Sequence, residues 1–257
     1  MSTLQLHEVT LGYVTKREAT LALESISLEV KDGEFISILG PSGCGKTTLL
    51  SIIAGLLKPT SGHVSFQSVQ SPEEENQVGY MLQQDYLFPW RTIEDNIMLG
   101  LKIKGIYSEK TKQFALRWLE QLGLADKKNF YPNQLSGGMR QRVALVRMLA
   151  TNPSLMLLDE PFSALDYQTK LKLEDLVYQT LKAEKKTAIL VTHDIGEAIA
   201  MSDRVVLLSP RPGRIHRIFD IPVELAKTLP FEARQHPNYN GLFQMIWKEM
   251  ESLGSTS

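Results

Sequence analysis

Hydrophobic and polar residues alternate at the start of the chain. Leu4, Leu6 and Val9 recur among polar residues, and residues 26–30 repeat the pattern, as strands buried on one face do. An unbroken apolar run at 35–39 predicts a fully buried strand. Short strands are expected at 63–66 and 78–82, on either side of an acidic loop at 71–76. The amino-terminal part is therefore predicted to be rich in β-structure.

Helical periodicity dominates the segment from Thr92 to about Ala150. Thr92 and Asp95 are spaced like a helix N-terminal cap, and apolar residues at 114–122 form a helical stripe that ends at Gly123. Apolar runs at 155–158 and 188–191, with a helix at about 167–184 between them, then predict parallel strands. Runs at 205–208 and 214–219 complete the sheet. The pattern predicts an α/β fold with a helical insertion.

A glycine-rich loop joins the buried strand at 35–39 to an apolar helix. Its residues are Gly40, Pro41, Ser42, Gly43, Cys44, Gly45, Lys46, Thr47 and Thr48. The glycines let backbone N–H groups point inward, and the helix beginning at Lys46 or Thr47 adds the positive end of its dipole. Lys46 is expected to reach the β- and γ-phosphates of a nucleotide, and Thr47 to hold Mg²⁺. The preceding strand, the spacing, the Lys-Thr pair and the helix together favour a phosphate-binding loop over a chance match.

Two carboxylates follow the apolar run at 155–158. Asp159 and Glu160 lie at the carboxyl end of a predicted parallel strand, which is where open α/β sheets bind ligands. Asp159 is expected on the Mg²⁺ shell, and Glu160 is expected to orient or deprotonate an attacking water. A solvated acidic loop is the alternative, and the phosphate-binding loop elsewhere in the chain favours catalysis.

A second glycine loop opens another helix. Ser136, Gly137 and Gly138 place a hydroxyl and backbone amides before an anion, although alone they are only a helix cap. The order of phosphate loop, Ser-Gly-Gly loop, acidic strand and His193 resembles that of ATP-binding-cassette (ABC) ATPases. The resemblance covers residues 4–235, with a helical insertion at about 88–152 and an amphipathic tail at 236–257. It implies a P-loop NTPase cassette with a RecA-like mixed sheet core, an N-terminal antiparallel β region and an inserted α-helical subdomain.

The same resemblance implies roles for four further residues. Gln83 resembles the glutamine that links Mg²⁺ and the attacking water to the helical insertion, and Asp166 lies in a segment similar to the D-loop. His193 is similar to the switch histidine that contacts the γ-phosphate. Tyr13 stands where the family places an aromatic that stacks on adenine, although it could also pack against its own strand. The other four histidines are expected to be structural.

The resemblance also implies partners. In this family the Ser-Gly-Gly loop of one subunit closes over nucleotide on the phosphate loop of another, so two copies would sandwich two ATP molecules head to tail. A single cassette without membrane spans would couple ATP hydrolysis to an integral membrane permease, as a peripheral subunit on the cytoplasmic face of the membrane. Residues 87–92 and 208–215 are similar to the importer branch that serves nitrate, sulfonates, taurine, bicarbonate and pyrimidine vitamin precursors. An extracytoplasmic substrate-binding protein would then be an indirect partner.

Composition limits the functions and partners that the chain can have. Lys and Arg total 28 against 29 for Asp and Glu, a formal charge of -1, which gives no reason to expect nucleic acid as a partner. Cys44 is the only cysteine, so an intrachain disulfide is excluded and a reducing compartment is indicated. A lone-cassette exporter subunit or a soluble ATPase of translation or DNA repair remains an alternative. The intact Glu160 disfavours a purely regulatory nucleotide-binding protein.

Two apolar segments have competing interpretations. Phe88 and Trp90 follow Gln83 closely and are predicted to dock on the permease, whereas a core position is the alternative. Near the carboxyl end, an amphipathic helical stripe is predicted to pack on the protein itself, or otherwise on a partner. The stripe consists of Phe243, Ile246, Trp247 and Met250.

Overall fold

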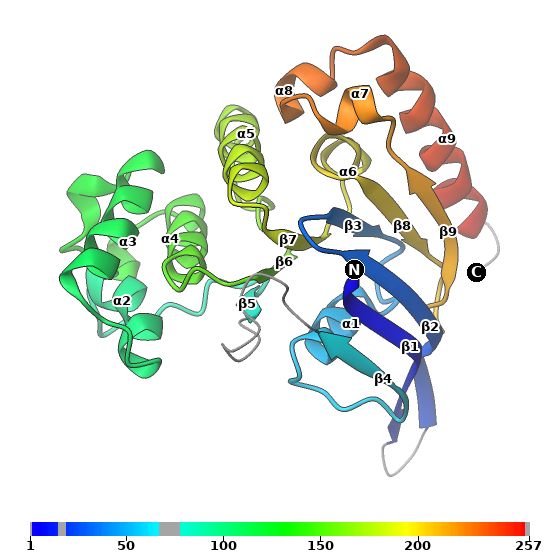
Figure 1. Ribbon diagram of the computed structural model, residues 1–257, viewed down its shortest axis with the longest axis horizontal. Coiled ribbons are helices and arrows are strands. Elements are labelled where there is room, and N and C mark those ends of the chain that lie inside the picture. Colours follow the sequence, from blue (N-terminus) through cyan, green and yellow to red (C-terminus); the bar gives the residue numbers. More distant parts are fainter. Residues whose placement is uncertain (1, 15–18, 67–77, 255–257) are drawn as a thin grey trace.

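Two sheets form the centre of the molecule, with a group of helices set apart at one side (Figure 1). The computed structural model describes residues 2–14, 19–66 and 78–254, so the acidic loop expected at 71–76 lies outside the described residues. Among the helices that the structure describes, none combines the length and the apolar character needed to cross a bilayer.

The smaller sheet has three antiparallel strands in the order β2-β1-β4. They are β1 (Ser2–Val14), β2 (Ala19–Lys31) and β4 (Ser61–Phe66). Leu6 pairs with Leu28 and Val9 with Ile26, and the apolar residues that alternate in the sequence are buried. The predicted antiparallel start is therefore confirmed. Its apolar face packs on the larger sheet's core and on α1 (Lys46–Ile53).

The larger sheet has six strands in the order β5-β6-β7-β3-β8-β9. They are β5 (Val78–Met81), β6 (Leu155–Asp159), β7 (Thr187–Val191), β3 (Phe35–Leu39), β8 (Arg204–Leu208) and β9 (Ile215–Asp220). All pair in parallel except β9, which is antiparallel to β8. Strands β3, β6 and β7 are buried along their whole length, which explains their unbroken apolar runs. Because Asp159 pairs with Val191 and Val191 with Ile38, the segments that follow these strands emerge at one edge.

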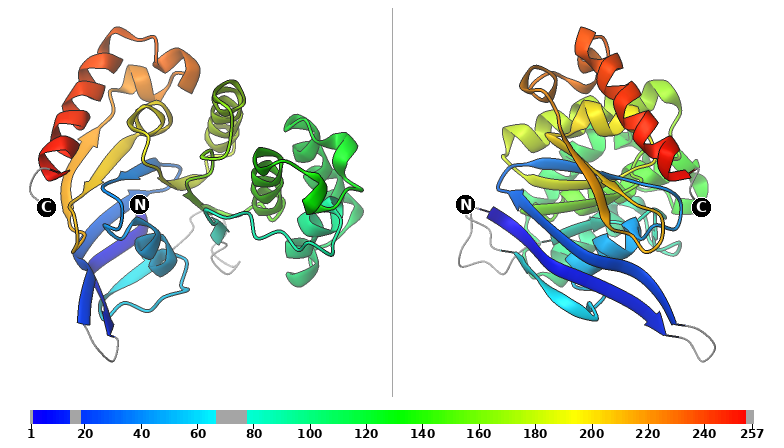
Figure 2. Two further views of the ribbon diagram at one scale, coloured as in Figure 1. Left: turned by 180° about the vertical axis from the view of Figure 1, so that it is seen from behind. Right: turned by 90° about the vertical axis from the view of Figure 1, so that its right-hand side faces the viewer.

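The helices set apart in Figures 1 and 2 are α2 (Ile93–Ile103), α3 (Glu109–Gln121) and α4 (Gly137–Leu149). Short 3₁₀ turns at Ala125–Lys127 and Pro132–Gln134 connect α3 to α4. The predicted cap is present, since the Thr92 hydroxyl oxygen accepts the Asp95 N–H at 3.1 Å. In the predicted stripe, Trp118 and Leu119 are buried and Phe114 is partly buried.

The remaining helices follow the parallel strands or close the chain. They are α5 (Tyr167–Ala183), α6 (Ile195–Met201), α7 (Val223–Ala226), α8 (Pro230–Ala233) and α9 (Pro237–Gly254). The hydrophobic pattern did not predict α6, which is fully buried and therefore lacks an amphipathic period. Asp194 begins it by accepting the Glu197 N–H at 3.1 Å.

The last helix, α9, packs beside α6 and the β8–β9 edge of the sheet (Figure 2). Ile246 is fully buried, and Phe243 and Met250 are half-buried against the same apolar cluster. The expectation that Trp247 also packs inward is wrong, since the side chain is 52% exposed. It lies one residue, about 100° of helix, beyond Ile246, and its ring stacks on Phe243.

The buried and exposed sides of α9 give a matched pair of variants. We expect Ile246→Ala to lower the free energy of unfolding by about 2–5 kcal/mol, because it leaves a cavity between α9 and the sheet. Trp247→Ala should cost about 1 kcal/mol or less, because the side chain is half exposed. Chemical denaturation of the two variants measures the difference. Equal losses would contradict the assigned packing of α9.

Candidate active site

The glycine loop connects the buried strand β3 to helix α1. Gly45 precedes the first helical residue with φ 101°, a left-handed backbone that favours glycine. A Cβ at Gly45 would lie 2.7 Å from a Leu23 methyl and 3.1 Å from the Ala22 carbonyl oxygen. The loop therefore lies directly against β2, and only a residue without a side chain fits there.

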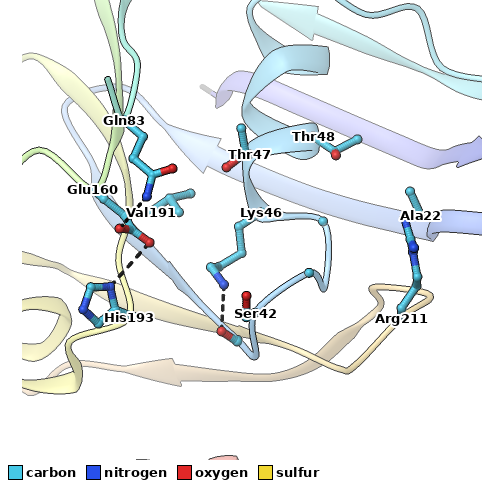
Figure 3. Close-up of a pocket in the computed structure, with 13 residues that line it drawn as sticks. Ala22, Ser42, Lys46, Thr47, Thr48, Gln83, Glu160, Val191, His193 and Arg211 are labelled. Atoms are coloured by element: carbon cyan, nitrogen blue, oxygen red, sulfur yellow. Dashed lines mark hydrogen bonds and ion pairs between the residues drawn. The ribbon is translucent and has the colours of Figure 1, made fainter. Parts of the chain in front are cut away.

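Lys46 begins α1 and its ammonium group turns back over the loop (Figure 3). Its Nζ donates to the Gly40 carbonyl at 2.7 Å and to the Pro41 carbonyl at 3.0 Å. An ammonium has three N–H donors, and the third is directed at Cys44 Sγ at 3.9 Å, a weak contact that an anionic oxygen in the loop can replace. The backbone thus fixes the position of this positive charge before any ligand binds.

Glu160 lies across the cavity from the loop, between two polar side chains (Figure 3). Gln83 Nε2 donates to Glu160 Oε2 at 3.0 Å, and His193 Nδ1 lies 3.4 Å from Glu160 Oε1. The backbone of Glu160 has φ 48°, which costs a non-glycine residue about 1–3 kcal/mol and is typical of functional sites. Hydrogen bonds hold this conformation, because the Glu160 N–H donates to Val191 O at 2.8 Å.

Asp159 ends β6 and is 1% exposed. Burial raises the pKa of this carboxyl, while the Thr47 hydroxyl beside it acts in the opposite direction. Among the described residues, its Oδ2 atom has no hydrogen-bond partner. A buried carboxylate oxygen without a partner next to a hydroxyl fits a divalent cation, and Mg²⁺ usually binds through one or two carboxylates plus phosphate oxygens.

A cavity of 470 Å³ unites the loop with the polar residues opposite it. It is lined by Ala22, Gly40, Ser42, Gly43, Gly45, Lys46, Thr47, Thr48, Gln83, Glu160, Val191, His193 and Arg211. The sequence predicted ten of these by number, and Ala22, Val191 and Arg211 are additions. The positive loop and the carboxylate side thus face the same space.

Comparison with known proteins identifies the family. Residues 23–163 match the protein family described as ABC transporter. The chain belongs to the ABC transporter family. The cassette is 59% identical over 253 residues to an uncharacterized ABC transporter ATP-binding protein, YtlC, from Bacillus subtilis (strain 168), covering 98% of this chain and 97% of the relative. It is 41% identical over 266 residues to the taurine import ATP-binding protein TauB of Ruegeria pomeroyi, covering 100% and 98%.

A solved ABC cassette has the same fold. The ATP-binding cassette MJ0796, in a dimeric post-hydrolysis state bound to ADP and Pi, matches with a TM-score of 0.76 and 35% identity, covering 85% of this chain and 99% of that one. The predicted fold class is therefore confirmed. The protein is the ATP-binding and ATP-hydrolysing subunit of an ABC transporter.

Several residues predicted to contact the nucleotide do not line the cassette's cavity. Cys44 is buried below the loop, where burial raises the pKa of its thiol, and Pro41 contributes its carbonyl to Lys46. Tyr13 is exposed at the end of β1, with its hydroxyl 3.3 Å from Thr48 Oγ1, which places its ring beside the loop helix.

The Ser-Gly-Gly loop of the cassette lies away from the phosphate loop of the same chain. Ser136 caps α4 by accepting the Met139 N–H at 3.3 Å, and a Cβ at Gly138 would lie 3.1 Å from Ala164 O. Gly137 lines a separate cavity of 420 Å³, which Gln83 also borders. Asp166 caps α5 through the Thr169 N–H at 3.0 Å. Within one chain, the structure does not bring these residues to the Lys46 side.

Gln141 on α4 also contributes to the site, and the sequence did not suggest it. Its Nε2 donates to the Glu160 carbonyl at 3.0 Å, and its Oε1 accepts the Ala164 N–H at 3.0 Å. The side chain is 5% exposed. The helix capped by Ser136 is thereby hydrogen-bonded to the backbone of Glu160 in the same chain. No local pattern marks this residue, because its partners are 19 or more positions away.

Behind His193, the cassette buries a cluster of charges. Lys170 Nζ lies 2.7 Å from Asp194 Oδ2 and 2.8 Å from Glu197 Oε2. Arg234 Nη2 lies 2.6 Å from Glu174 Oε2, and Glu174 is fully buried. Burial raises the pKa of Glu174 to about 7, against the opposing effect of Arg234.

This raised pKa gives the cassette a pH-dependent stability. Folded Glu174 holds its proton up to about pH 7, whereas the unfolded carboxyl releases it near its ordinary pKa of 4.5. The free energy of unfolding should therefore fall as the pH rises from 5 to 7, by at most about 1.4 kcal/mol per pH unit for this group. We expect Glu174→Gln to flatten this part of the curve in thermal or denaturant unfolding. The exposed Glu232→Gln serves as the control, and identical curves for both variants would refute the assignment.

Proposed function

We propose that this cassette is the energy-coupling subunit of an importer for a small anion such as a sulfonate, taurine or nitrate, or for a pyrimidine vitamin precursor. The observation that carries the proposal is the similarity to a taurine import ATP-binding protein over the whole chain, at 41% identity. The segments at 87–92 and 208–215, which resemble the same importer branch, support it. The cassette itself binds only nucleotide and the permease, so the substrate class rests on this similarity.

The phosphate loop binds and orients ATP in this proposal. The backbone N–H groups at the start of α1 and the ammonium of Lys46 neutralise the β- and γ-phosphates. Thr47, Asp159 and Gln83 would hold Mg²⁺, which supplies charge neutralisation on the phosphate oxygens. Tyr13, beside Thr48, stacks on the adenine.

Glu160 supplies the base for hydrolysis. Its carboxylate accepts a proton from the attacking water as the water oxygen bonds to the γ-phosphorus and the bond to the leaving ADP oxygen breaks. Gln83 and His193 hold the two carboxylate oxygens, so that the base is oriented before water arrives. In this proposal His193 also donates a hydrogen bond to the γ-phosphate.

The complete site needs two copies of the chain. Ser136, Gly137, Gly138 and Asp166 lie off the phosphate-loop cavity of their own subunit, and we infer that they act on the nucleotide of the partner. The dimeric state of the MJ0796 cassette supports this arrangement. Two ATP molecules are then enclosed, and hydrolysis releases the contact.

Replacing the base separates binding from hydrolysis. We expect Glu160→Gln to bind ATP with near-normal affinity, because the phosphates are held by the loop, and to slow turnover by at least about 100-fold. Gel filtration with ATP and Mg²⁺ should show a stable dimer of the variant. A variant that stays monomeric with ATP bound, or that retains full turnover, would contradict the assigned role of Glu160.

The segment after Gln83 is the proposed contact with the permease. Trp90 is 71% exposed and Leu87 is buried, so the loop has an inner anchor and an outer apolar side chain. Phe88 is partly buried and packs beside Trp90, with ring centroids 5.4 Å apart. Large exposed aromatics next to a sensor of nucleotide suit an interface that must follow ATP binding. In this proposal the permease holds the cassette at the cytoplasmic face of the membrane.

Trp90 and Leu87 provide a matched test of the proposed function. Trp90→Ser should leave the melting temperature and basal ATPase activity unchanged, while abolishing co-purification with the permease and cellular uptake of labelled taurine, sulfonate or nitrate. Leu87→Ala should instead cost about 2–5 kcal/mol of stability. If Trp90→Ser retains the permease and full uptake, the docking surface is wrong. If wild-type cells take up none of these compounds through the cassette, the substrate class is wrong.

A further inference from the structure

The nucleotide cavity has a second cationic side chain that the motifs do not account for. We propose that Arg211 binds the α-phosphate of the nucleotide held by its own subunit. This inference deepens the proposed function and rests on the nucleotide orientation given there. It assigns a binding role to the β8–β9 hairpin, which the sequence presented only as a mark of the importer branch.

The position of Arg211 along the cavity identifies the phosphate. Glu160 and His193 lie at one end, where the γ-phosphate is attacked, and Lys46 lies between (Figure 3). Arg211 extends beside Ala22 at the other end (Figure 3). Thr48 also lines the cavity, and the Tyr13 hydroxyl lies 3.3 Å from Thr48 Oγ1, although Tyr13 is not among the lining residues. A nucleotide with its γ-phosphate at Glu160 and its base at Tyr13 brings its α-phosphate to Arg211.

The hairpin that carries Arg211 is fastened to the phosphate loop and to β2. The Gly213 N–H donates to Ala22 O at 2.9 Å, and Gly213 O accepts the Glu24 N–H at 3.0 Å. A Cβ at Gly213 would lie 2.1 Å from Cys44 O, so the backbones are in contact and no other residue fits. Arg214 adds an ion pair to Glu24, with Nη2 to Oε2 at 2.6 Å. The hairpin that carries Arg211 is therefore held against the phosphate loop.

The tip of the hairpin is also stiff. Pro210 and Pro212 flank Arg211 and restrict the backbone on both sides. The Ser209 hydroxyl lies 3.0 Å from Pro210 O and 3.1 Å from Pro212 O, and it accepts the Arg214 N–H at 3.0 Å. A rigid backbone lowers the entropy lost when the side chain binds a ligand.

Within the part of the chain that the structure describes, no carboxylate forms an ion pair with Arg211. Its neighbour Arg214 is paired with Glu24, and Arg204 with Glu34. A guanidinium binds phosphate with two parallel hydrogen bonds, which an ammonium does not provide. The alternative is a solvated surface arginine, and its place in the lining of the phosphate cavity argues against that.

Calorimetric titration of the isolated cassette with ATP and with ADP, at low salt and with Mg²⁺, tests the proposal. The variants are Arg211→Gln and Arg211→Lys, with Arg117→Gln, an exposed arginine on α3, as the matched control. We expect Arg211→Gln to weaken ATP and ADP by the same factor, about tenfold, because both carry the α-phosphate. Arg211→Lys should lose less nucleotide affinity than Arg211→Gln, and the affinity of the control should be unchanged. Unchanged melting temperatures without nucleotide show that the hairpin is intact.

Three results would overturn it. If the folded Arg211→Gln variant binds ATP and ADP with unchanged affinity, Arg211 is a solvated surface residue without a role in binding. A loss confined to ATP places the guanidinium on the γ-phosphate instead. If Arg211→Gln and Arg211→Lys each lower the melting temperature as well as the nucleotide affinity, the role of Arg211 is structural. Lys46→Ala, measured alongside, separates the two proposals. If Lys46→Ala abolishes nucleotide binding and Arg211→Gln does not weaken it, the proposed nucleotide site is supported and only the role of Arg211 is rejected.

Discussion

The parallel register of β3, β6 and β7 is the constraint on which the site depends. Each strand is buried throughout, and their pairing brings the segments after Leu39, Asp159 and Val191 to one edge of the sheet. The phosphate loop, Glu160 and the loop with His193 follow those strands directly, and Asp159 is the last residue of β6. A slip of one residue in any strand would move its terminal side chain to the opposite face. The apolar core therefore sets the distances between the polar groups.

Much of this could be predicted because the relevant signals are local. Unbroken apolar runs identified the central strands, and a glycine loop followed by Lys46 identified the start of α1. The Thr92 cap and the buried stripe around Trp118 were likewise read from neighbouring residues. In each of these cases the residues that form the feature are close together in the sequence, so the sequence alone was enough to predict it.

What could not be predicted depends on contacts between distant segments. Gln141 matters because folding brings it to Glu160, and Arg211 because the β8–β9 hairpin packs on the phosphate loop. The orientation of Trp247 depends on how α9 is rotated against α6, which a helical period leaves undetermined within a broad stripe. Buried α6 has no period at all. In each case the missing information is the position of an element relative to others.

One buried amide has a mechanical consequence. Asn96 on α2 is fully buried and bonds four backbone groups of the turn before it: the Phe88 N–H at 2.7 Å and the carbonyls of Phe88, Arg91 and Thr92 at 3.2, 3.2 and 2.9 Å. The turn that displays Trp90 is therefore cross-braced to the helix. A displacement of the Trp90 indole should therefore move α2 with it instead of bending the turn. The exposed aromatic side chain and the helical subdomain then move as one rigid unit.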